Sequence, residues 1–506
     1  MDELVDRSAR ELRALIGRKA ISPVELLAAC RVRIERVDPK VNAVVAHDFD
    51  RARRDAEAAE AAVLKGERLG LLHGLPVAIK DLTATEGITT TYGSLIHKDN
   101  LPERDEIAVA RLRQAGAIVI GKTNTPEFGA GSNTTNRVYG ATVNPFDPLL
   151  SCSGSSGGAA AALATGMVPL ATGSDMGGSL RTPASFCGVV GHRTSPGAVP
   201  NDVRRYGWNP LSVDGPMGRS VADAALLMAA LVGADDRDPL AQVLSPDPFA
   251  NLAAADLGSL RVAFSADLGC APVSATIREH FTHTSRHLAP LFAHAEWREP
   301  DFGDVDFIFE TLRAVAFADV HGDYVAEHRH HAGPNVIANA ESAKTVSVRE
   351  VGRAHREQTD LFRRVQSFFD DFDLIICPTA SVVPFPVEDT YVAEIDGEKM
   401  ATYITWIAIT YAITLTSHPA TVIPCGLGPS GMPFGLQIVG RNRDDAGTLA
   451  IAAALEAALA EDPEFRRPVP DLDVLTAPET KSLAGKVPAA LEAHARSPVS
   501  GSVGVG

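Results

Sequence analysis

Serines and glycines concentrate in one stretch of the chain, residues 151–183. Two clusters, Gly-Ser-Ser-Gly-Gly at 154–158 and Gly-Gly-Ser at 177–179, flank a run of small residues that is typical of a short helix over about 158–165. Glycines let backbone N–H groups approach a ligand closely, and the first turn of a helix adds further free N–H groups. The stretch therefore combines hydroxyl groups with oriented amides, as acyl-transfer chemistry requires.

A serine nucleophile needs a base to accept its proton, and histidine is the usual base. Neither cluster contains a histidine, although His73 and His192 leave open a Ser-His-Asp triad assembled from distant segments. Residues 154–158 also match the G-x-S-x-G pattern of α/β-hydrolases, but no buried strand precedes them. Cys152 and Cys187 have no base beside them in the sequence and are interpreted as packing residues.

Lys80 is the other candidate base, because it ends an apolar run at 76–79 that is typical of a buried strand. A lysine has an ordinary pKa near ~10.4, so a working base requires a pKa lowered by about three units, roughly 4 kcal/mol. Burial would lower it in this way. The alternative interpretation is a lysine at a strand end whose ammonium reaches the solvent.

The elements that must position these residues are short apolar strands between helices, which predicts an α/β fold. The first 65 residues read as helices, one of them started by Ser22, Pro23 and Glu25 as a capping box. Strands are predicted near 118–120, 260–264, 374–378, 420–424 and 436–439, and a turn at 121–124. We expect an N-terminal helical arm over 1–70, one main domain over 71–475 and a loosely held tail over 476–506.

Composition narrows the class of protein. The 506 residues include 47 Lys and Arg against 63 Asp and Glu, so the net charge of −16 disfavours nucleic acid and anionic membranes as partners. The six cysteines are scattered and include no C-x-x-C pair. The sequence shows no secretory signal, and its longest apolar run, 404–415, is too short for a membrane span. These observations predict a cytoplasmic protein. The helical arm packs on the core or forms a dimer face, which leaves a homodimer open.

Six short segments that contain glycine follow one another along the chain, at 74–81, 121–124, 154–158, 175–183, 186–191 and 215–217. With them the chain resembles the amidase signature family, the serine-serine-lysine amidohydrolases. The resemblance implies a large twisted mixed β-sheet covered by helices, and no metal or organic cofactor. Arg193 departs from the family pattern, which has a lysine there.

The resemblance also implies roles for single residues. Ser179 would be the nucleophile, Ser155 the bridging serine after a cis peptide bond with Gly154, and Lys80 the neutral base. The oxyanion hole would be formed by backbone N–H groups of Met176, Gly177, Gly178 and Ser179. The residues expected to support the site are Asp175 and Arg181 as a buried pair, together with Ser156 and Ser132.

One relative in that family, the glutamine-hydrolysing component of the tRNA-dependent amidotransferase, binds glutamine through an acidic residue where this chain has Ile407. The substrate pocket is instead expected to be apolar, formed by Ala130, Tyr403, Trp406 and Ile407. An uncharged aliphatic or aryl carboxamide, or an ester or carbamate, is the expected substrate. The alternatives are that glutamine-hydrolysing component and, from a different class, a binding protein with a degenerate site.

A histidine patch at His328, His330 and His331 could suggest a metal site. Its spacing matches no zinc motif and no carboxylate-rich loop accompanies it. A solvated helical face is the favoured interpretation, so no metal is expected.

Overall fold

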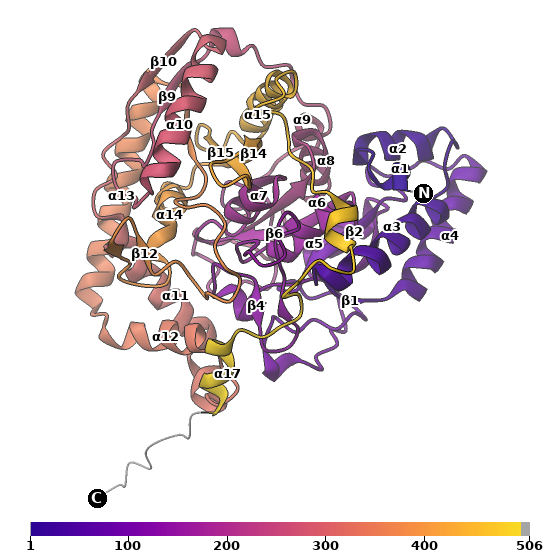
Figure 1. Cartoon of the computed structure of the whole chain (residues 1–506), viewed down its shortest axis with the longest axis horizontal. Helices are drawn as coiled ribbons and strands as arrows, with labels where there is room; N and C mark the ends of the chain where they lie inside the picture. The colour runs from indigo at the N-terminus through magenta and orange to yellow at the C-terminus, as the bar shows by residue number, and fades with distance from the viewer. Residues whose placement is uncertain (1, 497–506) are drawn as a thin grey trace, which may run out of the picture.

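The computed structural model describes residues 2–496. Within this part of the chain one eleven-stranded sheet runs through the molecule, and helices cover it (Figure 1). Its strands are, in spatial order, β1 (Val44–His47), β3 (Ile118–Thr123), β2 (Pro76–Lys80), β6 (Leu170–Asp175), β8 (Val213–Gly218), β7 (Val190–Arg193), β14 (Ala420–Leu427), β15 (Pro433–Val439), β11 (Leu374–Pro378), β9 (Arg261–Phe264) and β10 (His294–Trp297). The predicted α/β class and mixed sheet are confirmed.

The direction of the strands decides where the site forms. Strands β3, β2 and β6 are parallel neighbours, whereas β8, β7, β14, β15 and β11 pair antiparallel in turn. Strands β2 and β3 are buried along their whole length, as parallel strands covered on both faces are. The carboxyl ends of β2 and β6 therefore meet at one edge, which brings Lys80 close to Asp175.

Helices form where the sequence supplies caps. Ser22 and Glu25 make the predicted capping box, and Pro23 occupies the first helical position. The helices are α1 (Asp2–Val5), α2 (Ala9–Gly17), α3 (Pro23–Val37), α4 (Phe49–Lys65), α5 (Ile107–Gln114), α6 (Gly157–Ala164), α7 (Arg181–Cys187), α8 (Val221–Leu231), α9 (Asp247–Ala250), α10 (Ala275–Leu288), α11 (Val305–His328), α12 (Pro334–Ser342), α13 (Val348–Asp371), α14 (Ala408–Leu415), α15 (Asp445–Ala460), α16 (Leu472–Thr476) and α17 (Ala489–Arg496).

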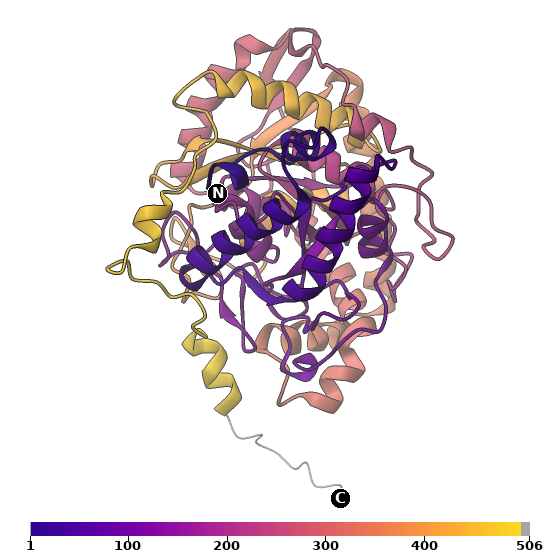
Figure 2. The same cartoon turned by 90° about the vertical axis from the view of Figure 1, so that its right-hand side faces the viewer.

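The N-terminal segment is not helical throughout. Helices α1 to α4 lie together on one side of the molecule and face the viewer in Figure 2. Between α3 and α4, however, strand β1 pairs antiparallel with β3 and forms an edge of the main sheet. This pairing also extends β3 through 121–123, where a turn was predicted, because Lys122 pairs with Ala46 and Thr123 with Val44.

The C-terminal segment crosses back over the N-terminal half, as the yellow chain in Figure 1 shows. Residues 477–486 are not loosely held: the N–H of Ala141 donates to the carbonyl of Lys486, and the N–H of Gly485 donates back to that of Ala141, each at 2.9 Å. Lys40 Nζ donates to the carbonyl of Thr480 at 2.7 Å. The last part of the predicted tail, 497–506, lies outside the described residues.

Candidate active site

Lys80 is the centre of the site. It ends β2, its side chain is buried, and its Nζ lies 2.7 Å from Ser155 Oγ, 2.8 Å from Ser156 Oγ and 3.0 Å from Ser174 Oγ. An ammonium has three N–H donors, so these three hydroxyl groups can accept all of them. The geometry brings together Lys80 and Ser155, which the sequence places 75 residues apart. Sequence reasoning missed Ser174.

Burial changes the chemistry of this lysine. It lowers the pKa of Lys80 to about 7, because removal from water disfavours the ammonium more than the nearby charges of Asp175 and Asp214 favour it. Neutral amine and ammonium are therefore both well populated near pH 7. The alternative interpretation of a lysine that reaches solvent does not hold, because only 1% of Lys80 is exposed.

Ser155 and Ser156 lie at the turn that leads into α6. The peptide bond between Gly154 and Ser155 is cis, as the resemblance implied. Ser156 precedes the helix but its side chain makes no capping hydrogen bond; its Oγ accepts from Lys80 and donates to the carbonyl of Ser174 at 3.3 Å. Both serines are buried, and Ser155 also borders the cavity described below.

Ser179 lies on the turn between β6 and α7. Gly178 has a φ of 125° there, and a Cβ at this position would lie 2.3 Å from Thr410 Oγ1, so only glycine fits. The N–H of Gly178 donates to Asp175 Oδ1 at 3.0 Å, which corrects its expected part in the oxyanion hole. The N–H groups of Met176, Gly177 and Ser179 have no acceptor within the described part of the chain.

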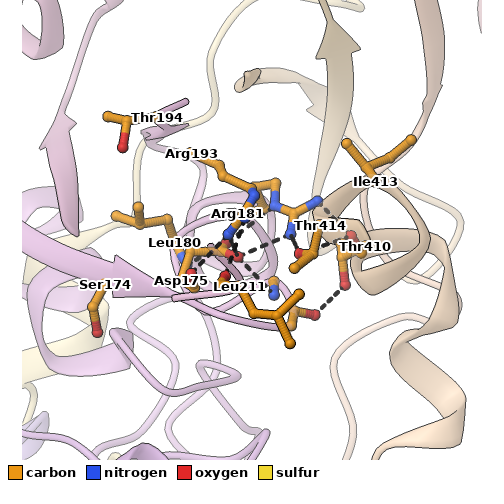
Figure 3. Close-up of polar contacts among 12 residues, drawn as sticks. Ser174, Asp175, Leu180, Arg181, Arg193, Thr194, Leu211, Thr410, Ile413 and Thr414 are labelled. Atoms are coloured by element: carbon orange, nitrogen blue, oxygen red, sulfur yellow. Dashed lines mark hydrogen bonds and ion pairs between the residues drawn. The ribbon is translucent and has the colours of Figure 1, made fainter. Parts of the chain in front are cut away.

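Asp175 holds this turn through a buried cluster of charges (Figure 3). Its carboxylate accepts from Arg181 Nε and Nη2 at 3.0 and 2.9 Å and from Arg193 Nη1 at 3.0 Å, and all three side chains are buried. The two guanidinium groups keep the pKa of Asp175 well below its usual range despite its burial. The expected buried pair of Asp175 and Arg181 is confirmed, and Arg193 joins it as a third member.

A cavity of about 320 Å³ opens over these residues. Ser155, Ser174 and Ser179 line its polar side, and the expected pocket residues Ala130, Tyr403 and Ile407 also line it, together with Ser132. Trp406 does not line the cavity. Its ring is fully buried and its Nε1 donates to Ser132 Oγ at 3.0 Å, so Trp406 positions a wall residue instead.

Nowhere in 2–496 do three or more His, Cys, Asp or Glu side chains gather as a metal site would need, and the six cysteines are free thiols. His328 ends α11, and His330 and His331 follow it with their rings 4.0 Å apart. Across the same residues, the helices are too short or too polar to span a bilayer.

Comparisons with known proteins agree with this geometry. The family model for amidases matches residues 25–449. The chain is 34% identical to an acylamidase of Rhodococcus erythropolis, over 89% of this chain and 95% of the relative. It is 33% identical to the A-type subunit of the glutamyl-tRNA(Gln) amidotransferase of Moorella thermoacetica, over 93% and 100% of the two chains.

Among solved structures, a bacterial aryl acylamidase of the amidase signature family superposes with a TM-score of 0.84, at 30% identity over 89% of this chain and 96% of that one. The likeness thus covers most of both chains. The chain belongs to the amidase signature family of amide-hydrolysing enzymes.

Proposed function

We propose that this enzyme hydrolyses the C–N bond of linear carboxamides bearing an aliphatic or aryl group, through an acyl-enzyme on Ser179. The observation that carries the proposal is the 2.7 Å contact between Lys80 Nζ and Ser155 Oγ, at the edge of a cavity that Ser179 also lines. A buried lysine with a pKa of about 7 can accept a proton at neutral pH, and an adjacent hydroxyl can relay it.

In the proposed reaction, neutral Lys80 takes a proton from Ser155 as Ser155 takes one from Ser179. The Ser179 oxygen then attacks the carbonyl carbon, and the N–H groups of Met176 and Gly177 stabilise the oxyanion. The leaving amine receives the proton back through Ser155, and the C–N bond breaks. Water, activated by the same pair, hydrolyses the acyl-enzyme and frees the carboxylic acid. Esters and carbamates would use the same groups.

Apolar side chains support an aliphatic or aryl group next to the reacting carbonyl. Phe309, Ile404 and Ile407 line the cavity, and a methyl group placed on Gly177 would lie 3.3 Å from Ile407 Cδ1 and Phe309 Cζ. These side chains therefore adjoin the turn that carries Ser179. The acylamidase name of a relative 34% identical to this chain supports the same substrate class.

The glutamine-hydrolysing component of the amidotransferase is the second candidate, favoured by a relative at 33% identity. Free glutamine has an α-ammonium, which calls for a carboxylate in the cavity. Ile407 is apolar and lines the cavity at the position where the amidotransferase pattern has its acidic residue. Release of ammonia from glutamine alone, with no turnover of anilides, would favour this candidate over the first.

The experiment measures the leaving group of four substrates: aniline from acetanilide, ammonia from a small aliphatic amide and from glutamine, and phenol from a phenyl ester. Wild type, Ser179→Ala and Ser212→Ala are compared. Ser212 lines the same cavity but is not among the three serines hydrogen-bonded to Lys80, so it serves as the matched control. Anilide turnover that is lost only in Ser179→Ala supports the proposal. Turnover that persists in Ser179→Ala would overturn the assigned nucleophile.

A further inference from the structure

One face of α11 forms a long wall of the cavity. The lining residues on this helix recur every three or four positions, as residues on one helical face do: Phe309, Arg313, Ala316, Phe317, Val320 and His321. Phe309 begins this series beside Gly177 of the nucleophile turn. Arg313 follows one helical turn later, a rise of about 6 Å along the helix axis.

Arg313 is held firmly in that wall. It is only 9% exposed, it donates hydrogen bonds to Asn339 Oδ1 and to the Tyr403 hydroxyl, and its guanidinium lies 5.6 and 5.5 Å from the ring centroids of Phe317 and Tyr403. These contacts fix the orientation of the group and leave it along the cavity wall.

No carboxylate of the described residues forms an ion pair with Arg313, in contrast to Arg181, which Asp175 neutralises. A buried cation without a counter-charge is costly, so it is retained where an anion binds. Glu310, on the same helix, forms no ion pair with Arg313 among the described residues, and its Oε1 accepts from Thr402 at 3.1 Å. Burial raises the pKa of Glu310, and the charge of Arg313 offsets only part of that rise.

The other charged residues of the cavity do not neutralise Arg313. Arg204 and Arg205 also line it, and Arg205 is already paired with Asp319 at 3.8 Å. Glu106 is the one carboxyl among the described lining residues, and burial raises its pKa to about 7. The charged residues that line the cavity are therefore mainly positive, although the whole chain has a net charge of −16.

We propose that Arg313 binds a carboxylate carried by the substrate, separated from the scissile carbonyl by a short alkyl chain or one aromatic ring. The inference rests on the proposed function. It differs from the sequence-based expectation in one respect: the substrate carries a negative charge, whereas the apolar residues around 407 predict an uncharged amide. A planar guanidinium held by two neighbours and two rings matches the two oxygens of a carboxylate.

Two matched pairs of anilides test this. The carboxylate lies on the amine side in 4-acetamidobenzoate against 4-acetamidotoluene, and on the acyl side in the monoanilide of succinic acid against butyranilide. For wild type we expect the anionic member of at least one pair to have a kcat/KM about 10- to 100-fold higher, mainly through KM. In Arg313→Gln that ratio should fall to near one.

Two further variants separate binding from folding. Arg313→Lys keeps the charge but loses the planar fork, so it should retain part of the preference. Arg205→Gln removes an exposed, already paired arginine from the rim of the same cavity and should keep the wild-type ratio. Equal kcat/KM within both pairs for wild type, or a ratio unchanged in Arg313→Gln, would overturn the inference.

Binding to Ser179→Ala separates this inference from the proposed function. By calorimetry the variant should bind the preferred carboxylate about 10-fold or more tightly than its neutral partner, and Ser179→Ala with Arg313→Gln should lose the difference. Hydrolysis of neutral anilides without any carboxylate preference, in turnover or in binding, would overturn the inference alone. Carboxylate binding without hydrolysis of any amide or ester would support it while contradicting the proposed function.

Discussion

At the scale of single residues, the site depends on the hydrogen bonds that Lys80 Nζ makes in each of its two protonation states. As an ammonium it donates to Ser155, Ser156 and Ser174; as a neutral amine it has a lone pair that accepts a proton from Ser155. Burial brings the two states close in free energy near pH 7. The same lysine can therefore take up and return a proton in one catalytic cycle.

We expect kcat/KM to rise with pH through a midpoint near 7, because only the neutral form of Lys80 accepts the proton. Lys80→Met should lower kcat by about 10²–10⁴-fold. The control is Lys122→Met: Lys122 is equally buried but donates to the Thr83 carbonyl and to Thr85 Oγ1, outside the cavity, so its loss should leave the midpoint near 7. A pH profile in Lys80→Met with the wild-type midpoint would contradict the lysine base.

Lys80 should also be visible in the stability of the protein. Its pKa is about 7 when folded and near ~10.4 when unfolded, so between these values the unfolded chain binds more protons. Its contribution to the free energy of unfolding therefore increases with pH in this window, by up to about 1.4 kcal/mol per pH unit. Lys80→Met should lack this part of the slope in urea unfolding from pH 7 to 9.

The sequence predicts Lys80, Ser155 and Ser179 through their motifs but does not single out Ser174. The sequence did contain a pattern that points to Ser174. Side chains of a strand alternate between its two faces, so Ser174 lies on the same face of β6 as Thr172. Thr172 Oγ1 accepts from the Lys80 N–H at 3.2 Å. Ser174 could be recognised as a partner of Lys80 only once β2 was known to pair with β6, and a pairing between distant strands is not visible in local sequence.

The prediction that Trp406 lines the pocket was wrong for a different reason. An aromatic residue in an apolar run can pack behind a pocket as readily as line it.

At the scale of elements, the turn from β6 to α7 is shaped by Asp175. It accepts the N–H groups of Gly178 and Leu180 as well as both arginines, so it fixes the backbone before and after Ser179. Figure 3 shows Arg181 also reaching Thr410 and Thr414, which ties the turn to helix α14 from the later part of the chain.

Asp175→Asn should destabilise the protein by about 3–5 kcal/mol in urea unfolding at pH 7, because two buried guanidinium groups lose their counter-charge. The carboxylate has a lowered pKa, so its contribution is present above its unfolded pKa of ~3.9 and is lost as the pH falls below it. The matched control is Asp235→Asn, whose partner Arg237 is half exposed, with an expected change under about 1 kcal/mol. Equal losses in the two variants would contradict this account.

Helices were predicted more accurately than strands because their ends carry local signals. Ser22 and Glu25 mark the start of α3, and Gly66 takes the left-handed conformation that ends α4. Strand β1 has only four residues and no alternating pattern that is long enough to detect. Its pairing turns 121–123 into strand, although a Gly-Lys-Thr-Asn sequence by itself favours a turn.

At the scale of the whole molecule, the site lies where the parallel and antiparallel parts of the sheet adjoin. Strands β2 and β6 carry Lys80 and Asp175 on their carboxyl ends, and β8 continues antiparallel from β6. Helices α11 and α14 belong to the later half of the chain yet supply Phe309 and Thr410 to the nucleophile turn. The sequence motifs identify the residues on β2 and β6, whereas the cavity wall formed by α11 could be recognised only from the three-dimensional structure.

The C-terminal segment completes this assembly, which a pair of truncations can test. Residues 477–486 form hydrogen bonds with Ala141 and with Lys40, so they connect the turn that follows α3 to the loop that precedes the first serine cluster. A chain ending at Thr476 loses these hydrogen bonds and leaves the N–H of Ala141 and the carbonyl of Pro148 without their partners, which costs free energy where they stay buried. We therefore expect its Tm to fall by several degrees, about 2–4 °C for each kcal/mol lost.

A chain ending at Lys486 is the matched control, because it keeps every one of those contacts and removes α17. It should melt closer to the full chain than the chain ending at Thr476 does. Since the contacted loop leads into 151–158, the shorter chain should also lose kcat before it unfolds, when rates are measured well below its Tm. Identical Tm values for the two truncations would mean that 477–486 lie on the surface without stabilising it, and that the loop before Ser155 is held by the sheet alone.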